Sequence, residues 1–305
     1  MVTSGVEATV NEWVMIGVPT SAGAHHAGQD LAPDALRAAG LAGRLTAAGL
    51  TLTDAGNLPG AVFAADHADP AARNLAAVAR VARDVADAVD AAAGDGKLPL
   101  LLGGDCTITI GALAGLRRRH PDAGLIYLDG DTDLGVPGDG GSGILDSMGV
   151  SHLLGRGASE LTHLGGDAPL LEPSRLAILA ADPRETTDAG RAYLAAAGVD
   201  LQEAPAFIAD PVAAARRAVA VVTATSRWYL VHFDIDVVDS GDLPLGNFPH
   251  YGSGVSLDAA LAALRVLCSD PAFAGLVLTE VNPTHDPGGR ELARLAGGLG
   301  PALGA

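Results

Sequence analysis

Short apolar runs alternate with longer amphipathic segments along this chain. Apolar residues bounded by Gly, Pro or Asp predict buried strands over residues 14–18, 50–54, 98–102, 125–129, 176–180, 228–236 and 275–281. Apolar positions that recur at three and four residues predict helices over 33–48, 71–93, 107–119, 186–197, 211–222 and 257–267. Continuous apolar strands separated by helices predict a parallel sheet with helices on both faces.

Acidic residues gather where three of these strands end. The three segments are Gly-Gly-Asp-Cys-Thr at 103–107, Asp-Gly-Asp-Thr-Asp at 129–133 and His-Phe-Asp-Ile-Asp at 232–236. Side chains alternate faces along an extended chain, so alternate acids of each Asp-x-Asp run can share one side. In parallel sheets ligands bind beyond the carboxyl ends of the strands. We therefore expect these acids to converge on one pocket.

Five carboxylates in one pocket repel one another unless cations hold them together. Acids beyond strand ends also serve as turn formers and helix caps, which is the simpler interpretation of a single Asp-x-Asp run. Two such runs after two apolar strands favour a divalent metal centre.

Length and charge narrow the class of protein. The 305 residues contain no composition break, which predicts a single domain over 1–305. The net charge of −17 argues against nucleic acid or an anionic membrane as a partner. No apolar run reaches the roughly 18 residues needed to cross a bilayer. Two cysteines fit a reducing compartment, and we expect a cytoplasmic protein.

The three motifs resemble those of the ureohydrolase family, the arginases, agmatinases and related amidinohydrolases. That family has Gly-Gly-Asp-His-Ser, Asp-Ala-His-x-Asp and Ser-Phe-Asp-x-Asp segments, and further similarity lies at 16–19, 252–254 and 279–283. The resemblance implies a three-layer α/β/α fold with a mostly parallel eight-stranded sheet. It also implies a homo-oligomer, a trimer or hexamer, and two Mn²⁺ ions that activate water to release urea from a guanidino substrate.

Carried over position by position, the resemblance assigns six metal ligands. The two family histidines fall on Cys106 and Asp131, and the four family acids are retained: Asp129, Asp133, Asp234 and Asp236. The glutamate that grips the guanidinium falls on Glu280, and the proton-shuttling histidine of arginases falls on Asp146. Every active-site histidine of the family motifs is therefore replaced.

These replacements change the expected chemistry. Two divalent cations supply +4 while the five aspartates supply −5, so water bound to the metal is polarised less. Oxygen ligands favour Mn²⁺, Mg²⁺ or Ca²⁺, and a thiolate favours Zn²⁺ or Fe²⁺. We expect two Mn²⁺ ions, with fewer ions or another divalent ion left open. Cys106 is a ligand, a nucleophile or an inert core thiol.

His232 lies two residues before Asp234 and hence on the same strand face. It is interpreted as a metal ligand or proton carrier, or as a core histidine bonded to a backbone carbonyl.

The family residues that hold free arginine are incomplete. The asparagine that binds the amino-acid carboxylate is replaced by Gly135, while Ser142 and Asp182 remain. The resemblance thus implies an amidinohydrolase that cleaves a small guanidino compound other than arginine to urea and an amine. Two alternatives stay open: the same fold with a single metal or Cys106 as nucleophile, and a non-catalytic binding or regulatory protein.

Overall fold

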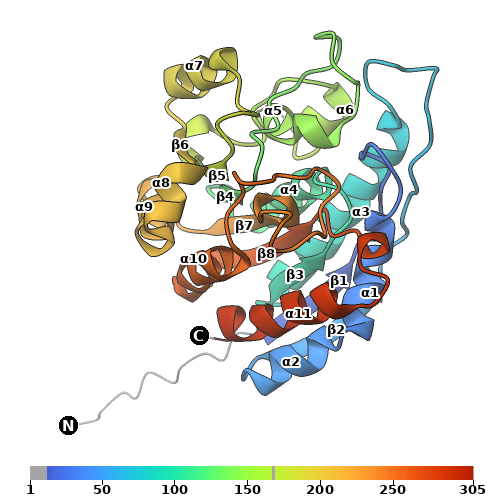
Figure 1. Ribbon diagram of the computed structural model, residues 1–305. Coiled ribbons are helices and arrows are strands. Elements are labelled where there is room, and N and C mark those ends of the chain that lie inside the picture. The colour runs from blue at the N-terminus through green and yellow to red at the C-terminus, as the bar shows by residue number, and fades with distance from the viewer. Residues whose placement is uncertain (1–11, 167–168, 305) are drawn as a thin grey trace.

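The computed structural model describes residues 12–166 and 169–304 and forms one eight-stranded sheet with helices on both faces (Figure 1). All strand pairs are parallel, in the order β2-β1-β3-β8-β7-β4-β5-β6. The strands are β1 Glu12–Gly17, β2 Thr51–Asn57, β3 Leu98–Leu102, β4 Gly124–Leu128, β5 Leu176–Ala181, β6 Asp200–Glu203, β7 Tyr229–Asp234 and β8 Phe273–Thr279. The fold class expected from the sequence is confirmed.

Two hydrophobic cores lie on opposite faces of this sheet. One is formed with α1 Ala32–Ala38, α2 Leu41–Ala47, α8 Ala204–Ala209, α9 Pro211–Thr223, α10 Leu257–Ser269 and α11 Arg290–Leu303. The other is formed with α3 Leu75–Gly94, α4 Ile108–Arg119, α5 Gly149–Leu153, α6 Ser159–Thr162 and α7 Asp188–Ala197. Because both faces are covered, β4, β5, β7 and β8 are buried along their whole length.

Close packing of α3 on α4 depends on glycine. A Cβ built on Gly111 would lie 2.3 Å from the carbonyl oxygen of Ala82, and one on Gly115 would lie 2.3 Å from that of Ala86. The two glycines are one helical turn apart, so they let the backbones of α3 and α4 meet along one stripe. This contact fixes the direction in which α4 leaves the end of β3.

Several element boundaries differ from those predicted. The helix expected over 33–48 is two helices, because Gly40 adopts a left-handed conformation with φ 81° between them. The strand expected over 228–236 ends at Asp234 and continues as a 3-10 turn, Ile235–Val237. β6 and α11 were not anticipated. No helix within the described ranges has the length and apolar character that a membrane span requires.

Register explains which side chains meet beyond the strand ends. β7 lies between β4 and β8, and His232 is level with Tyr127 on β4 and Val277 on β8. Asp234 is level with Thr279, the last residue of β8. Residues that are level on neighbouring strands present their side chains to the same face. Three strands therefore deliver polar groups to one point at the carboxyl edge of the sheet.

Candidate metal centre

A cavity of about 170 Å³ opens at the carboxyl ends of β3, β4, β7 and β8. It is lined by His25, Cys106, Asp129, Asp131, Asp133, Asp146, Ser147, Glu185, Asp234, Asp236, Phe248, Pro249, His250 and Glu280. All six residues that the family resemblance assigns as metal ligands lie in this lining. The convergence predicted from the three motifs is therefore present.

The charge of this cavity is one-sided. Of the described residues that line it, eight are Asp or Glu and none is Lys or Arg. Burial and neighbouring acids raise the pKa of Asp129 and Asp234 well above the usual value. Burial likewise raises the pKa of Asp236 to about 6 and that of Glu280 to about 8. These shifts show that the ionised acids are unfavourable without a cation, so the cavity has the electrostatics of a cation site.

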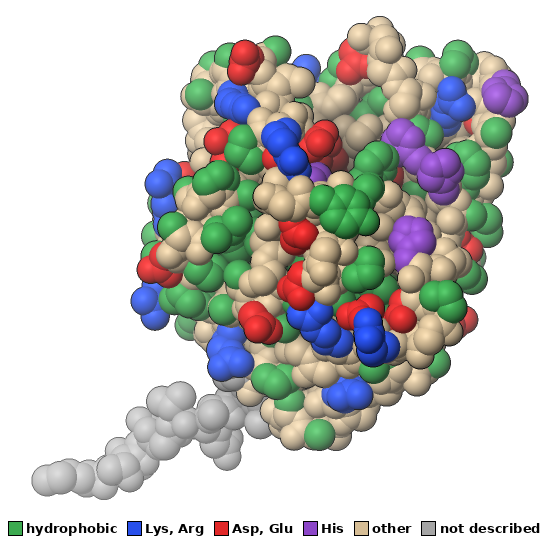
Figure 2. Space-filling model, viewed as in Figure 1, with side chains coloured by type: hydrophobic (Ala, Val, Ile, Leu, Met, Phe, Trp, Pro, Cys, Tyr) green, Lys and Arg blue, Asp and Glu red, His purple; other side chains and the backbone are tan. Residues whose placement is uncertain are grey.

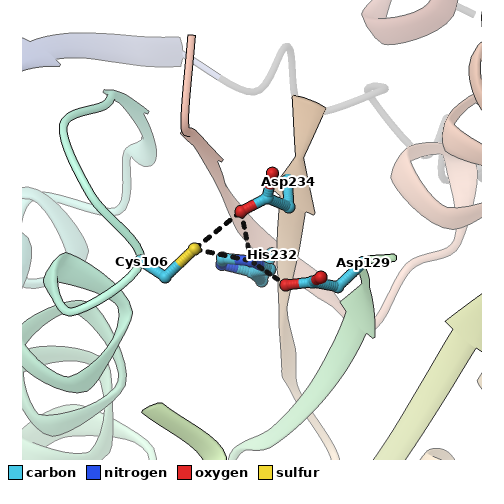
Figure 3. A group of neighbouring side chains, drawn as sticks. All are labelled: Cys106, Asp129, His232 and Asp234. Atoms are coloured by element: carbon cyan, nitrogen blue, oxygen red, sulfur yellow. Dashed lines mark hydrogen bonds and ion pairs between the residues drawn. The ribbon is translucent and has the colours of Figure 1, made fainter. Parts of the chain in front are cut away.

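Four donor atoms are close enough together to share one ion: those of Cys106, Asp129, His232 and Asp234, all within 4.8 Å of one another (Figure 3). The Cys106 thiol donates to Oδ2 of Asp234 over 2.6 Å. Nε2 of His232 lies 3.4 Å from Oδ2 of Asp129, 3.9 Å from Oδ2 of Asp234 and 3.9 Å from Sγ of Cys106. All four side chains are buried.

His232 is fixed from two sides. Its ring stacks on Tyr127, with centroids 3.8 Å apart and planes 4° from parallel. Its Nδ1 lies 2.7 Å from the hydroxyl of Thr109 on α4, so its partner is a side chain rather than the backbone carbonyl of the simpler interpretation. Burial lowers the pKa of His232 to about 3, which keeps the imidazole neutral. Its Nε2 faces the acids and the thiol.

Burial and the nearby carboxylates, Asp234 first, raise the pKa of the Cys106 thiol well above its usual value. A thiol in this state is a weak nucleophile, because the thiolate is the attacking species. Cys106 therefore suits metal ligation, where the cation displaces the proton, better than covalent catalysis without a metal.

The other three acids of the expected ligand set lie around this group. Asp236 is buried in the 3-10 turn, and its Oδ1 has no hydrogen-bond partner among the described residues. Asp131 is half-buried and accepts from the Thr132 amide over 2.5 Å. Asp133 accepts from the Tyr127 hydroxyl over 2.5 Å. An orphaned buried carboxylate oxygen among so many acids fits a divalent cation.

Glu280 follows β8 directly and is held on both oxygens. Its Oε1 accepts from the Cys106 amide over 3.2 Å, and its Oε2 accepts from Nε2 of the buried Gln29 over 2.8 Å. Its φ of 61° is unusual for a non-glycine residue and aims the carboxylate into the cavity. Each oxygen keeps a free lone pair for a planar cation.

The remaining predicted site residues occupy different surroundings. Asp146 is buried in the cavity lining, where burial and then Glu280 raise its pKa well above the usual value. Ser142 is exposed, and its hydroxyl accepts from the amide of Ile144. Asp182 is buried outside the lining and accepts from Arg184 and Ser253.

His250 is a cavity residue that sequence reasoning missed. It is buried, and its Nδ1 lies 3.3 Å from Oδ2 of Asp182. A Cβ built on Gly130 would lie 2.7 Å from its Nε2, so the ring occupies space that only glycine at 130 leaves free. The one signal in the sequence was glycine at this position, where the family pattern has alanine.

Known proteins are similar to this chain along most of its length. A family model described as the arginase family matches residues 11–300. The arginase of Bacillus caldovelox is 28% identical over 277 residues, covering 89% of this chain and 91% of that protein. Its crystal structure superimposes with a TM-score of 0.86 at 26% identity, over 97% of this chain and 99% of that one. A formiminoglutamase from Trypanosoma cruzi, solved with Mn²⁺, shares the fold at 18% identity with a TM-score of 0.76, over 99% of this chain and 95% of that one.

Proposed function

The chain belongs to the arginase family of hydrolases, and from that premise we propose that it cleaves a guanidino compound other than free arginine to urea and an amine. We further propose that the reaction depends on divalent metal. The observation that carries the proposal is the cavity itself, where a fixed glutamate faces a buried cluster of acids.

The acids, thiol and imidazole of the cavity are the groups that would hold metal. Mn²⁺ suits the oxygen donors Asp131, Asp133 and Asp236. The formiminoglutamase relative was solved with Mn²⁺. Two ions fit the charge of the site better than one, because the lining carries eight acids. When bound, such ions supply Lewis-acid activation of water.

Glu280 is proposed to bind the guanidinium group. A planar guanidinium can donate to both carboxylate oxygens at once, and the bonds from Gln29 and the Cys106 amide hold those oxygens in place. The incoming positive charge also favours the ionised form of this carboxyl, whose pKa burial raises to about 8. Orientation of the substrate carbon toward the acids follows from this fixed contact.

Asp146 is proposed to donate a proton to the leaving amine. Burial and then Glu280 raise its pKa above the usual carboxyl value, which is the direction that a general acid requires. It lies in the same lining as Glu280, which is the second cause of that shift. His232, with a pKa near 3, does not supply this proton at neutral pH.

The cavity lining disfavours a substrate that carries a carboxylate. Free arginine would place its carboxylate where no lining residue of the described chain is Lys or Arg. Phe248, which is 44% exposed, packs edge-on against His25 with centroids 4.9 Å apart, and both line the cavity. Figure 2 shows hydrophobic and histidine side chains side by side on one face of the molecule. We therefore infer an agmatine-like amine or an alkyl or aryl guanidine as substrate.

The test is urea release by purified Mn²⁺-loaded protein from a matched panel. The panel pairs arginine with agmatine, which lacks its carboxylate, and guanidinobutyrate with a butyl guanidine. We expect activity on the carboxylate-free member of each pair. Glu280→Gln, which keeps the shape of the side chain, should lower kcat/KM by about 10² or more. No urea from any member of the panel would refute the proposal, and a preference for arginine would refute the substrate class.

A further inference from the structure

We propose that Cys106, Asp129, His232 and Asp234 form a four-coordinate metal site that is selective for Zn²⁺ or Fe²⁺ over Mn²⁺. The inference rests on the proposed function in treating the cavity as a metal-dependent site. It goes further because it names His232 as a ligand and assigns the ion from the types of the donor atoms. The family resemblance had instead placed Asp133 in the ligand set and given His232 no such role.

The separations of the donor atoms from His232 Nε2 are close to those around a tetrahedral ion. Zinc bonds of roughly 2.0 Å to nitrogen or oxygen and 2.3 Å to sulfur place neighbouring donors about 3.3 to 3.6 Å apart. The three contacts of His232 Nε2 measure 3.4 Å to Asp129, 3.9 Å to Asp234 and 3.9 Å to Cys106. The 2.6 Å contact between Cys106 and Asp234 is the hydrogen bond that an ion would replace.

The imidazole is already oriented as a ligand. Thr109 contacts Nδ1 over 2.7 Å, which directs Nε2 into the cluster, and stacking on Tyr127 holds the plane of the ring. Metal-bound histidines characteristically hydrogen-bond through their second nitrogen in this way. Figure 3 shows the ring of His232 between the side chains of Cys106 and Asp129, with the carboxylate of Asp234 beside it.

The donor types select the ion. One thiolate and one imidazole favour Zn²⁺ or Fe²⁺ over Mn²⁺, which prefers oxygen ligands. Three anionic donors around a divalent ion leave a net charge of about −1 at this site. Binding releases the thiol proton of Cys106 to solvent and forms the metal–sulfur bond, with no change of oxidation state.

Asp133 provides the contrast. Its Oδ2 is engaged by the Tyr127 hydroxyl over 2.5 Å, and it is outside the group of donors that lie within 4.8 Å of one another. If His232 is the fourth ligand, the Asp133→Asn protein should still bind Zn²⁺. If Asp133 is the fourth ligand, the same substitution should abolish Zn²⁺ binding.

The experiment titrates metal-depleted full-length protein with Co²⁺ and then displaces it with Zn²⁺. We expect one equivalent of Co²⁺ to give intense tetrahedral visible bands and a thiolate charge-transfer band in the near ultraviolet. Cys106→Ser should remove the charge-transfer band. Thr109→Val, close in shape to the native residue, should weaken Zn²⁺ binding about 10- to 100-fold through the loss of His232 orientation. Asp133→Asn should weaken Zn²⁺ binding less than Asp129→Asn does.

Three outcomes overturn the inference. They are a weak octahedral Co²⁺ spectrum, loss of Zn²⁺ binding in Asp133→Asn, and unchanged binding in a folded Thr109→Val protein. Far-ultraviolet circular dichroism and a thermal melt establish that each variant is folded. Urea release with Mn²⁺ in a protein that does not bind Zn²⁺ tetrahedrally would reject this inference and keep the proposed function. A tetrahedral Zn²⁺ site without urea release would do the reverse.

Discussion

Metal-free protein should become less stable as pH rises above neutrality. The cause is Glu280, whose native pKa of about 8 exceeds its ordinary value of 4.5 because of burial. A carboxyl whose pKa is raised on folding stabilises the native state below its unfolded pKa, and that contribution is lost as pH rises through the native pKa. Asp129 and Asp234 carry shifts in the same direction, so they add to the loss.

The size of this effect follows from proton linkage. One carboxyl with a native pKa of about 8 loses roughly 1 kcal/mol of folding free energy between about pH 7 and pH 8.5. His232, with a native pKa near 3, acts in the opposite sense, but most of its contribution is complete above about pH 7. Burial also raises the pKa of the Cys106 and Cys268 thiols, which adds to the loss of stability above pH 7.

Urea unfolding of chelator-treated protein at about pH 7 and pH 8.5 measures this loss. Glu280→Gln should reduce the difference between the two pH values. Saturating divalent metal should reverse its sign, because metal binding releases protons and grows stronger with pH. Metal-free stability that is flat or rises over this interval would refute the assignment of raised pKa values to the cavity acids.

Three further sets of substitutions test the packing of the helices and of the site. Gly111→Ala places a Cβ against the backbone of α3 and should lower the free energy of unfolding by about 1–3 kcal/mol, measured by urea unfolding. Gly43→Ala, on the open side of α2, should raise it by up to about 1 kcal/mol. Equal effects of the two substitutions would contradict the packing argument. Tyr127→Phe removes the hydroxyl that donates to a buried carboxylate and should cost about 1.5–3 kcal/mol in metal-free protein, so an unchanged urea midpoint would count against that bond. Gly130→Ala should displace His250 and lower kcat/KM, and adding His250→Ala should relieve the associated loss of stability; additive effects on stability would show that the two positions do not interact.

The sheet was predictable from the sequence because its strands are buried on both faces. β3 was placed at its observed bounds, since five apolar residues end at a Gly-Gly pair. β6 was missed because its sequence, Asp-Leu-Gln-Glu, has little apolar content and lies at the edge of the sheet. The break at Gly40 was missed because the apolar spacing continues across it, and only the left-handed φ ends the first helix. Hydrophobic patterns in the sequence therefore predict which segments are buried better than they predict where the backbone turns.

The convergence of the acids was predictable, but their partners were not. Strand order brings β3, β8, β7 and β4 together, and sequence order does not reveal that arrangement. Thr109 and Tyr127 belong to an ordinary helix and an ordinary strand, and only the folded structure shows that both contact His232. The stacking of Tyr127 on His232 follows from their level positions on β4 and β7. The spacing of residues along the sequence does not predict such contacts between side chains.

Imidazole groups reach the site from positions other than those of the family histidines. His25 and His250 line the cavity, and His232 belongs to the four-residue cluster, while the positions of the family histidines hold Cys106 and Asp131. A cavity that had merely lost its function would gain stability from neutralising its buried acids, because unpaired buried charges are costly. Here the acids are present, glycine at 130 leaves room for the His250 imidazole, and Thr109 orients that of His232. These contacts support the proposed metal centre over the non-catalytic alternative.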